Sequence, residues 1–142
     1  MPAEEPTIDA ATLQATFESL AADCVKRLSL RVESVDEDAV SLSLPVTPDL
    51  VHGGGVVCGQ AILSAADTAM LLAMIARLGG FKPMTTVQLQ ASFLRPVPRV
   101  TASVGVVARV LRLGKTLSYG EVDFRTADGK LAAHATTTYA LI

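Results

Sequence analysis

The sequence predicts an α+β fold in which an antiparallel sheet packs against one long buried helix. Residues 61–78 form a long apolar run that ends at two glycines. Segments on either side of this run alternate apolar and polar residues with a period of two, which is typical of half-buried strands. Elements in the order helix, two strands, long helix and four strands favour a sheet that covers a helix.

Composition and charge limit the class of protein. The chain has 142 residues, and this length favours a single domain spanning residues 1–142. Hydrophobic residues make up 50% of the sequence, which argues against disorder over most of its length. The formal net charge of -2 gives no basic surface for nucleic acid, so we expect no nucleic-acid partner.

Cysteine content and hydropathy indicate a cytoplasmic protein. Cys24 and Cys58 are too few for a disulfide scaffold or a four-cysteine zinc site, so we expect reduced thiols and no metal. Residues Met1–Glu5 lack the basic and apolar regions of a signal peptide. The apolar run is interrupted by Asp67 and Arg77 and is shorter than a clean membrane span, so we interpret it as a buried helix. A membrane span is the weaker alternative.

The first element is predicted to be a helix from Ala10 to about Arg27. Thr7 or Asp9 would cap its N-terminus. Residues Met1–Pro6 are polar and include two prolines, so we expect a flexible tail there. Apolar residues recur through the helix at spacings of three and four and form one face: Leu13, Phe17, Leu20, Ala21, Cys24 and Leu28.

Six strands are predicted from alternation and from turn residues. The first two span residues 28–35 and 39–46 and are joined by a turn at Asp36-Glu37-Asp38. The other four follow the long helix, with turns at Gly114-Lys115 and Ala127-Asp128-Gly129, and span Thr85 to Leu94, Val100 to Leu113, Leu117 to Thr126 and Lys130 to Leu141.

The long helix, predicted from Gln60 to Leu78, is apolar on nearly every side, which indicates burial on every side. Because a sheet covers only one face, we expect a second subunit to cover the other. Asp67 lies in the middle of this helix. A buried carboxylate must be bonded or must face a cavity, where it could act as a general base. The spacing leaves open a structural alternative, in which Asp67 bonds Thr68 or Ser64 or reaches solvent.

Glycines precede the long helix. Gly53 to Gly55 follow His52, and Gly59 stands directly before Gln60. The first N–H groups of a helix are unbonded and lie at the positive end of the helix dipole, so they can stabilise an oxyanion. The triple glycine could equally serve only to turn the chain.

Residues Gly55 to Ala69, which read GVVCGQAILSAADTA, resemble the signature of PaaI-type thioesterases in the 4-hydroxybenzoyl-CoA thioesterase superfamily. That signature is an Asn, then x-x-G-x-x-H-G-G, then a helix that reaches L-x-D-x-A. The segments Thr85–Pro96, Leu113–Ser118 and 130–141 also match the family. The resemblance covers residues 28–142 and implies a hotdog fold, in which an antiparallel sheet wraps around the central helix, with an extra N-terminal helix here.

The register of the resemblance is set by counting back from Asp67. It places the family's His-Gly-Gly on Cys58-Gly59-Gln60, its Asn on His52 and its first Gly on Gly55. The conspicuous His52-Gly53-Gly54 lies too far from the acid to be that motif. The chain thus departs from the family pattern at residues 52 and 58–60.

The resemblance implies hydrolysis of an acyl-CoA thioester to a free acid and coenzyme A, with no cofactor besides the coenzyme A of the substrate. Asp67 would be the general base or nucleophile, the Gly59 N–H would polarise the thioester carbonyl, and Thr86 would orient the water or the acid. His52 would be a fourth catalytic residue, near the thioester, where it would position the leaving group or the water, with a loop histidine bonded to backbone as the alternative. The glycine and the acid would come from opposite subunits of a homodimer, itself part of a dimer of dimers.

Residues around the helix start and at strand ends are candidates for substrate binding. Gln60, Cys58 and Gly55 flank the proposed oxyanion glycine. Arg95 and Lys115 would bind the phosphates of coenzyme A, because cationic side chains at strand ends suit phosphate oxygens. Ordinary surface charge is the alternative for either cation, and Cys58 as a nucleophile is the weaker alternative to a small buried thiol.

Two further expectations concern His134 and the lining of the acyl pocket. His134, in the alternating last strand, is expected to be structural or exposed. The pocket would be lined by small residues and methionines of the long helix, namely Ala65, Ala66, Ala69, Met70 and Met74.

Two other functions remain open at this point. Hotdog hydratases or dehydratases of acyl-CoA pair their acid with a His on the same helix, and no His lies between Thr68 and Leu78. A non-catalytic acyl-CoA-binding sensor would usually carry a DNA-binding domain, and only one short helix precedes the first strand. Both observations favour the hydrolase.

Overall fold

The computed structural model describes residues 8–142, so the tail predicted at residues 1–6 lies outside the described part. The helices are α1 (Ala10–Leu20), α2 (Asp23–Lys26) and α3 (Gly59–Leu78), with one 3-10 turn, η1 (Pro48–Leu50). The strands are β1 (Arg31–Val35), β2 (Ala39–Pro45), β3 (Met84–Phe93), β4 (Ser103–Leu113), β5 (Leu117–Arg125) and β6 (Leu131–Leu141).

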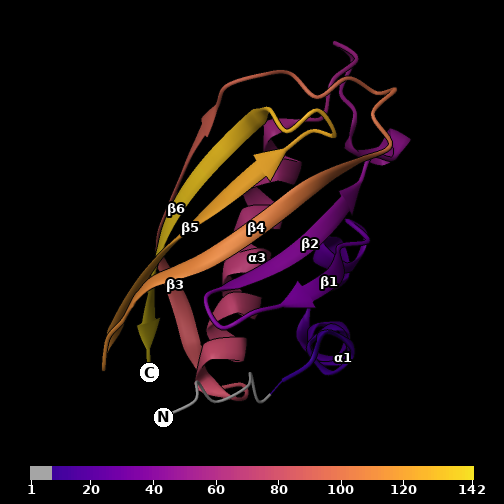
Figure 1. Ribbon diagram of the computed structural model, residues 1–142. Coiled ribbons are helices and arrows are strands. Elements are labelled where there is room, and N and C mark those ends of the chain that lie inside the picture. Colours follow the sequence, from indigo (N-terminus) through magenta and orange to yellow (C-terminus); the bar gives the residue numbers. More distant parts are fainter. Residues whose placement is uncertain (1–7) are drawn as a thin grey trace.

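One six-stranded sheet wraps around α3 (Figure 1). The strand order is β1-β2-β4-β5-β6-β3, and every neighbouring pair is antiparallel. The strands on either side of α3 in the sequence therefore meet in one sheet, because β4 inserts beside β2 while β3 pairs with β6. This architecture confirms the predicted α+β fold, with the N-terminal helices beside β1 and α3.

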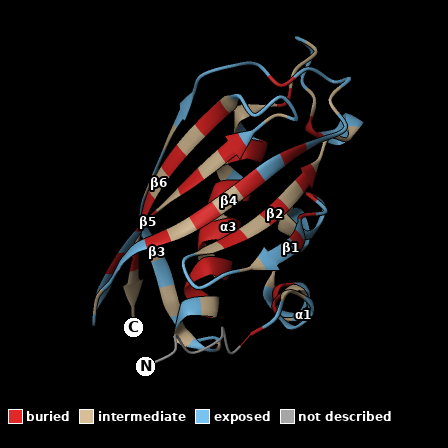
Figure 2. Cartoon of the chain, in the orientation of Figure 1, coloured by how far each residue is buried: buried red, intermediate tan, exposed pale blue. Residues whose placement is uncertain are grey.

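The core lies between α3 and the concave face of the sheet. Inward side chains of β2, β4, β5 and β6 alternate with outward ones, and most of α3 is buried (Figure 2). By length and hydropathy α3 could cross a membrane, with a mean hydropathy of 1.6, but 61% of that span is buried inside the protein. This burial favours the interpretation of α3 as the core helix of the fold.

Both helix ends that the sequence marks are confirmed. The Thr12 N–H donates to Asp9 Oδ1 at 2.7 Å, so Asp9 caps α1. At the C-terminal end of α3, Gly79 adopts a left-handed φ of 77°, and the Gly80 N–H donates to the Ile75 carbonyl at 3.1 Å. Glycine is suited to this position because it tolerates positive φ without a steric cost.

The single helix predicted from Ala10 to about Arg27 is wrong. α1 ends at Leu20, the backbone is extended at Ala21 and Ala22, and α2 then begins. Neither alanine breaks a helix by itself, but the bend lets α2 pack against α3, so tertiary packing overrides local propensity. Cys24, which a continuous helix would place on the apolar face, is exposed.

Candidate active site

Asp67 is held by hydroxyl groups from two strands. Thr86 Oγ1 donates to Asp67 Oδ1 at 2.7 Å, and Tyr139 Oη lies 2.6 Å from the same Oδ1 and 2.7 Å from the Asp67 main-chain oxygen. The structure thus brings Thr86 and Asp67 together, and it adds Tyr139, which the sequence interpretation missed.

The strand register explains why both hydroxyls reach one carboxylate. Thr86 of β3 is the direct partner of Tyr139 of β6, and their side chains share the concave face of the sheet. The register shifts between Thr86 and Gln88, so Val87 is an additional residue in β3. Such a bulge bends a strand locally and changes the direction of nearby side chains.

The second carboxylate oxygen of Asp67 accepts no side-chain hydrogen bond within residues 8–142. Among residues 8–142, both side-chain hydrogen bonds to the acid fall on Oδ1, and no buried side-chain oxygen or nitrogen lacks a partner. Oδ2 therefore has access to open space. The Thr68 hydroxyl donates instead to the Ser64 carbonyl at 2.8 Å, so the alternative in which Thr68 or Ser64 bonds the acid is wrong.

Tyr139 is a donor at any ordinary pH. Burial raises the pKa of its phenol well above the usual value, and the nearby charge of Asp67 raises it further. A sequence signal for this residue existed: a tyrosine at an inward position of an alternating strand needs a buried partner for its hydroxyl. What the sequence did not reveal is which partner the strand register would provide.

An apolar cavity of about 320 Å³ lies beside Asp67. Its walls come from the α1–α2 segment, from one face of α3 and from the start of β3. The lining residues include Phe17, Leu20, Ala21, Ala22, Val25, Leu71, Leu72, Ile75 and Met84.

The predicted lining of the acyl pocket is wrong for this cavity. Ala65, Ala66, Ala69, Met70 and Met74 are fully buried on other faces of α3 and do not line it. The Met70 thioether occupies the space where any Cβ at position 120 of β5 would stand. The sequence marked these residues as buried, but it could not say that they pack against the sheet.

Gly59 is the first residue of α3, one residue earlier than predicted. The first N–H groups of any α-helix lack an intrahelical partner, and the N-cap residue Cys58 makes no side-chain bond to those of α3. A Cβ at position 59 would lie 3.3 Å from the ring of Phe93, at the end of β3. Gln60 beside it is exposed.

Gly59 and Asp67 are too far apart in one chain to act on the same carbonyl. Eight residues of α-helix separate them, which corresponds to about 12 Å along the axis. Oxyanion donors and a general base must each come within about 3 Å of the atoms they serve. One copy of the chain therefore holds half of each expected site.

The glycines after His52 form a turn. The Gly54 N–H donates to His52 Nδ1 at 2.8 Å, the Gly55 N–H donates to the His52 carbonyl at 2.9 Å, and Gly55 has a φ of +83°. His52 is exposed, in the loop that leads into α3. The structure thus shows the backbone-bonded histidine that was the alternative, near the Gly59 end of α3.

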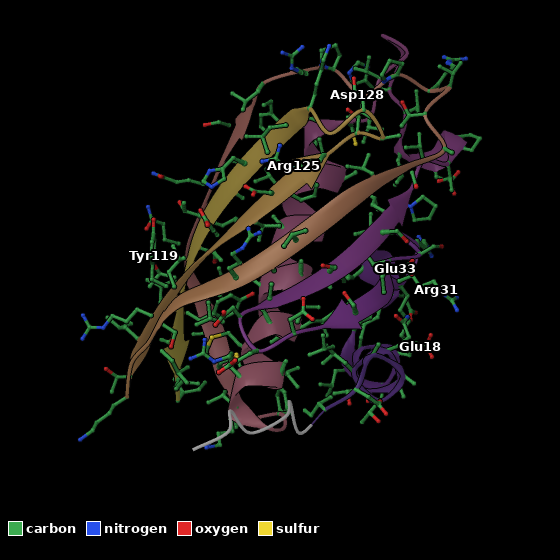
Figure 3. The ribbon with its side chains drawn as sticks, viewed as in Figure 1. Glu18, Arg31, Glu33, Tyr119, Arg125 and Asp128 are labelled. Carbon is green, nitrogen blue, oxygen red and sulfur yellow. The ribbon has the colours of Figure 1, made fainter. Side chains whose placement is uncertain are left out.

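The two candidate phosphate ligands lie at opposite ends of the sheet. Arg95 follows β3, and its N–H donates to the Ala132 carbonyl at 3.1 Å, whereas Lys115 is in the turn between β4 and β5. The sheet between these ends is about 30 Å long, because nine residues of β6 span it. Figure 3 shows Arg125 near the end of β5 on the Arg95 side, with Tyr119 farther along the strand toward the β4–β5 turn.

Arg95 faces a groove with two further cations, Arg125 and Lys130. Arg125 lies 3.9 Å from Asp123 and Lys130 lies 3.9 Å from Asp128, whereas Arg95 is in no ion pair among residues 8–142. Lys115 is exposed. Because three cationic side chains line the groove at the Arg95 end, it is the stronger candidate for binding phosphate groups.

His134 lies on the outer face of the sheet, away from Asp67. Its Nε2 is 3.1 Å from Glu121 Oε2 and 3.7 Å from Asp123 Oδ1, and Arg109 pairs with Asp123 at 3.4 Å. The prediction of a structural or exposed histidine is confirmed. Within residues 8–142, no group of three His, Cys, Asp or Glu side chains is arranged to hold a metal ion.

Comparison with known proteins decides the family. The Thioesterase superfamily profile matches residues 54–133, which include Gly59, Asp67 and Thr86. The chain belongs to the thioesterase superfamily. An inferred esterase of Saccharolobus solfataricus is 30% identical over 110 residues, which cover 78% of this chain and 76% of that protein.

Solved thioesterase structures share the hotdog fold of this chain. A Haemophilus influenzae thioesterase superposes with a TM-score of 0.84 at 24% identity, covering 95% of this chain and 91% of that one. The PaaI protein of the E. coli phenylacetic acid degradation operon superposes at 0.77 with 22% identity, covering 91% of both chains. The protein is thus a hotdog thioesterase, an enzyme that hydrolyses thioesters.

Proposed function

We propose that this thioesterase hydrolyses acyl-CoA thioesters in a site shared between two copies of the chain. The observation that carries the proposal is the carboxylate of Asp67, which two hydroxyls hold by one oxygen at the mouth of an apolar cavity. A carboxylate fixed in this way presents its second oxygen to a water molecule or to a carbonyl carbon.

The free edge of β3 supports the shared site. Asp67 lies beside Thr86 near the start of β3, and Gly59 lies beside Phe93 at its end. If β3 pairs antiparallel with β3 of a second copy, the start of one strand meets the end of the other. Each Asp67 then comes close to the partner's glycine, which a single chain cannot achieve.

The same pairing accounts for the two distant cations. Arg95 follows the end of β3, and Lys115 lies at the end of the sheet where β3 begins. A two-fold axis through the middle of β3 would put Arg95 of one copy at the same end as Lys115 of the other. We propose that both contribute to binding the coenzyme A phosphates, with Arg95 in the larger role.

The proposed reaction needs no cofactor beyond the substrate's own coenzyme A. Oδ2 of Asp67 takes a proton from water, and the resulting hydroxide adds to the thioester carbon. The Gly59 N–H of the other copy stabilises the oxyanion. The C–S bond then breaks, and the thiolate leaves with the proton that Asp67 has held. Direct attack by Asp67 through a mixed anhydride is the second route open to the same geometry.

The proposed setting is the cytoplasm, where both thiols would stay reduced. Cys24 and Cys58 are free in the structure, and the apolar helix is in the core. Cys58 is the N-cap of α3, and its own N–H donates to the Leu50 carbonyl at 2.8 Å, so we assign it a place beside the substrate and no chemical role.

A panel of acyl-CoA substrates with a thiol reagent tests the proposal. We expect release of coenzyme A from at least one substrate, and a loss of about a hundredfold or more in kcat for Asp67→Asn. The Asp67→Asn protein should remain folded, because an amide still accepts hydrogen bonds from Thr86 and Tyr139. Tight binding of every acyl-CoA without thiol release, by wild type as well, would contradict hydrolysis.

A further inference from the structure

One wall of the cavity beside Asp67 comes from the α1–α2 segment, and not from the sheet or α3. The bend between α1 and α2 places Leu20, Ala21 and Ala22 along the cavity, with Val25 of α2 next to them. Leu20 lines the cavity and is 44% exposed, so a large apolar side chain is left uncovered there. An apolar surface that faces an open cavity is suited to an apolar ligand.

The chemistry of the lining changes along the cavity. At one end are the carboxylate of Asp67 and the hydroxyls of Thr86 and Tyr139, which are already bonded to one another. At the other end the lining is aliphatic or aromatic, with Phe17 and Ile75 among its members. Within residues 8–142, Asp67 is the only charged side chain that lines this cavity.

Two more polar residues line the cavity, and both lie at its Asp67 end, because Thr68 follows the acid in α3 and Thr85 precedes Thr86 in β3. Among residues 8–142, the lining far from the thioester therefore offers no partner for a hydroxyl, amino or carboxylate group. The Thr68 hydroxyl, which is also part of the wall, already donates to the Ser64 carbonyl. A polar group pushed into the apolar end would lose its water without gaining a hydrogen bond. The cavity therefore selects against acyl groups with a polar far end.

The size of the cavity limits the length of the acyl group. A volume of about 320 Å³ corresponds to about ten groups the size of a water molecule, at roughly 30 Å³ each. From Asp67 to Ile75 the wall runs along two turns of α3, or about 12 Å. Both measures suit a chain of about eight to ten carbons.

We propose that the α1–α2 bend closes the far end of the acyl site and makes this enzyme selective for unsubstituted aliphatic acyl groups of medium length. The inference rests on the proposed hydrolysis of acyl-CoA at Asp67. Ala21 is the residue best placed to set the length, because it is small, half-buried and lines the cavity at the bend.

The test compares Ala21→Phe with Ala15→Phe on a series of straight-chain acyl-CoAs. Ala15 is exposed on α1 and does not line the cavity, so its variant is the matched control. We expect kcat/KM of wild type to be highest for acyl chains of about eight to ten carbons, because chains of this length fill the cavity. Ala21→Phe should lower kcat/KM for decanoyl-CoA by at least about tenfold, and leave butyryl-CoA within about twofold of wild type.

Each outcome separates the inference from the function on which it depends. Butyryl-CoA hydrolysis reports that the variant is folded and that its chemistry is intact. Val25→Ala, which enlarges the cavity, should move the optimum to longer chains. If wild type hydrolyses no acyl-CoA, the proposed function fails. If it hydrolyses acyl-CoA with the same length profile in Ala21→Phe as in Ala15→Phe, or prefers hydroxybenzoyl-CoA or succinyl-CoA, the inference alone is overturned.

Discussion

The two edges of the sheet are built differently. β1 has five residues, and Figure 3 shows its charged side chains Arg31 and Glu33 together with Glu18 of α1 on that side of the molecule. β3 has ten residues, none of them charged, and it exposes 60% of Val87 and 52% of Phe93. An exposed, uncharged strand of that length is a surface on which another strand can pair.

The backbone hydrogen bonding of the two edges also differs. The Val32 N–H of β1 donates to Gln14 Oε1 of α1 at 2.7 Å, and the Gln14 amide donates to the Leu30 carbonyl at 3.3 Å. A side chain thus takes the place of a neighbouring strand. Among residues 8–142, β3 pairs only with β6, so its other side is open. The β1 edge is closed by Gln14, and the open β3 edge is the one that carries Thr86, whose hydroxyl bonds the acid of α3.

Charges on the open edge should have the largest effect. Val87→Lys combined with Gln90→Lys would place like charges opposite one another across the two-fold axis. We expect sedimentation to show a monomer and thioester hydrolysis to fall by about a hundredfold or more, since each acid loses its oxyanion donor. Ser34→Lys on β1 is the control and should leave assembly and rate unchanged. A monomeric double variant with the wild-type rate would show that one chain suffices.

Removing the phenol that holds the acid should have the next largest effect. Tyr139→Phe takes one hydrogen bond from Asp67, and a bond to a charged group of this kind corresponds to about a tenfold loss in kcat. We expect kcat to fall and KM to change little. Tyr119→Phe, at an exposed tyrosine, is the matched control. An unchanged kcat with a lower melting temperature would reduce Tyr139 to a structural residue.

Alkaline unfolding provides a second measurement on Tyr139. Because burial raises the pKa of this phenol in the folded state, the folded chain keeps a proton that the unfolded chain loses above about pH 10. Its contribution to stability is therefore complete below that pH and declines as the pH rises further. Chemical denaturation of Tyr139→Phe should show a shallower loss of stability above that pH than wild type. Parallel curves for the two proteins would contradict the raised pKa.

Opening the closed edge should affect stability and leave the rate intact. Gln14→Leu leaves the Val32 N–H without its partner, which should cost about 1–3 kcal/mol of unfolding free energy. Glu18→Gln, nearby on the same helix, should change it by less than about 0.5 kcal/mol. Urea denaturation measures both, and the specific activity of the folded fraction should match wild type. A lower specific activity would mean that the two edges are coupled.

The smallest effect is expected at Cys58. Cys58→Ser should keep the rate within about twofold of wild type, because the Cys58 side chain makes no capping bond and does not meet Asp67 in the same chain. The thiol-release assay measures this directly. Abolished turnover in a folded Cys58→Ser protein would move the nucleophile from Asp67 to the thiol.

Local signals in the sequence predicted most of the fold. Alternation and turn residues located all six strands within a few residues, and the Asp9 cap and Gly79-Gly80 stop appear where expected. These features depend on residues that are neighbours in the chain. The break after Leu20 was missed, because it results from packing of α2 on α3 and no residue marks it.

The site was predicted only in part, for a similar reason. The pairing of Thr86 with Asp67 followed from the family resemblance, and the structure places them 2.7 Å apart. Tyr139 lies 72 positions from Asp67 in the sequence, and only the β3–β6 register brings it to the acid. The lining of the cavity was misassigned, because an apolar helix does not reveal which of its faces meets the sheet.

Mixing two inactive variants tests the shared site most directly. Asp67→Asn removes the acid, and Gly59→Pro removes the N–H while keeping a first-turn residue that helices accept. The extended backbone of Cys58, with ψ 150°, is compatible with a following proline. Unfolded together in equal amounts and refolded, the two should recover about a quarter of wild-type activity, because half of the dimers are mixed and each has one intact site. A mixture no more active than its components would contradict a site built from two chains.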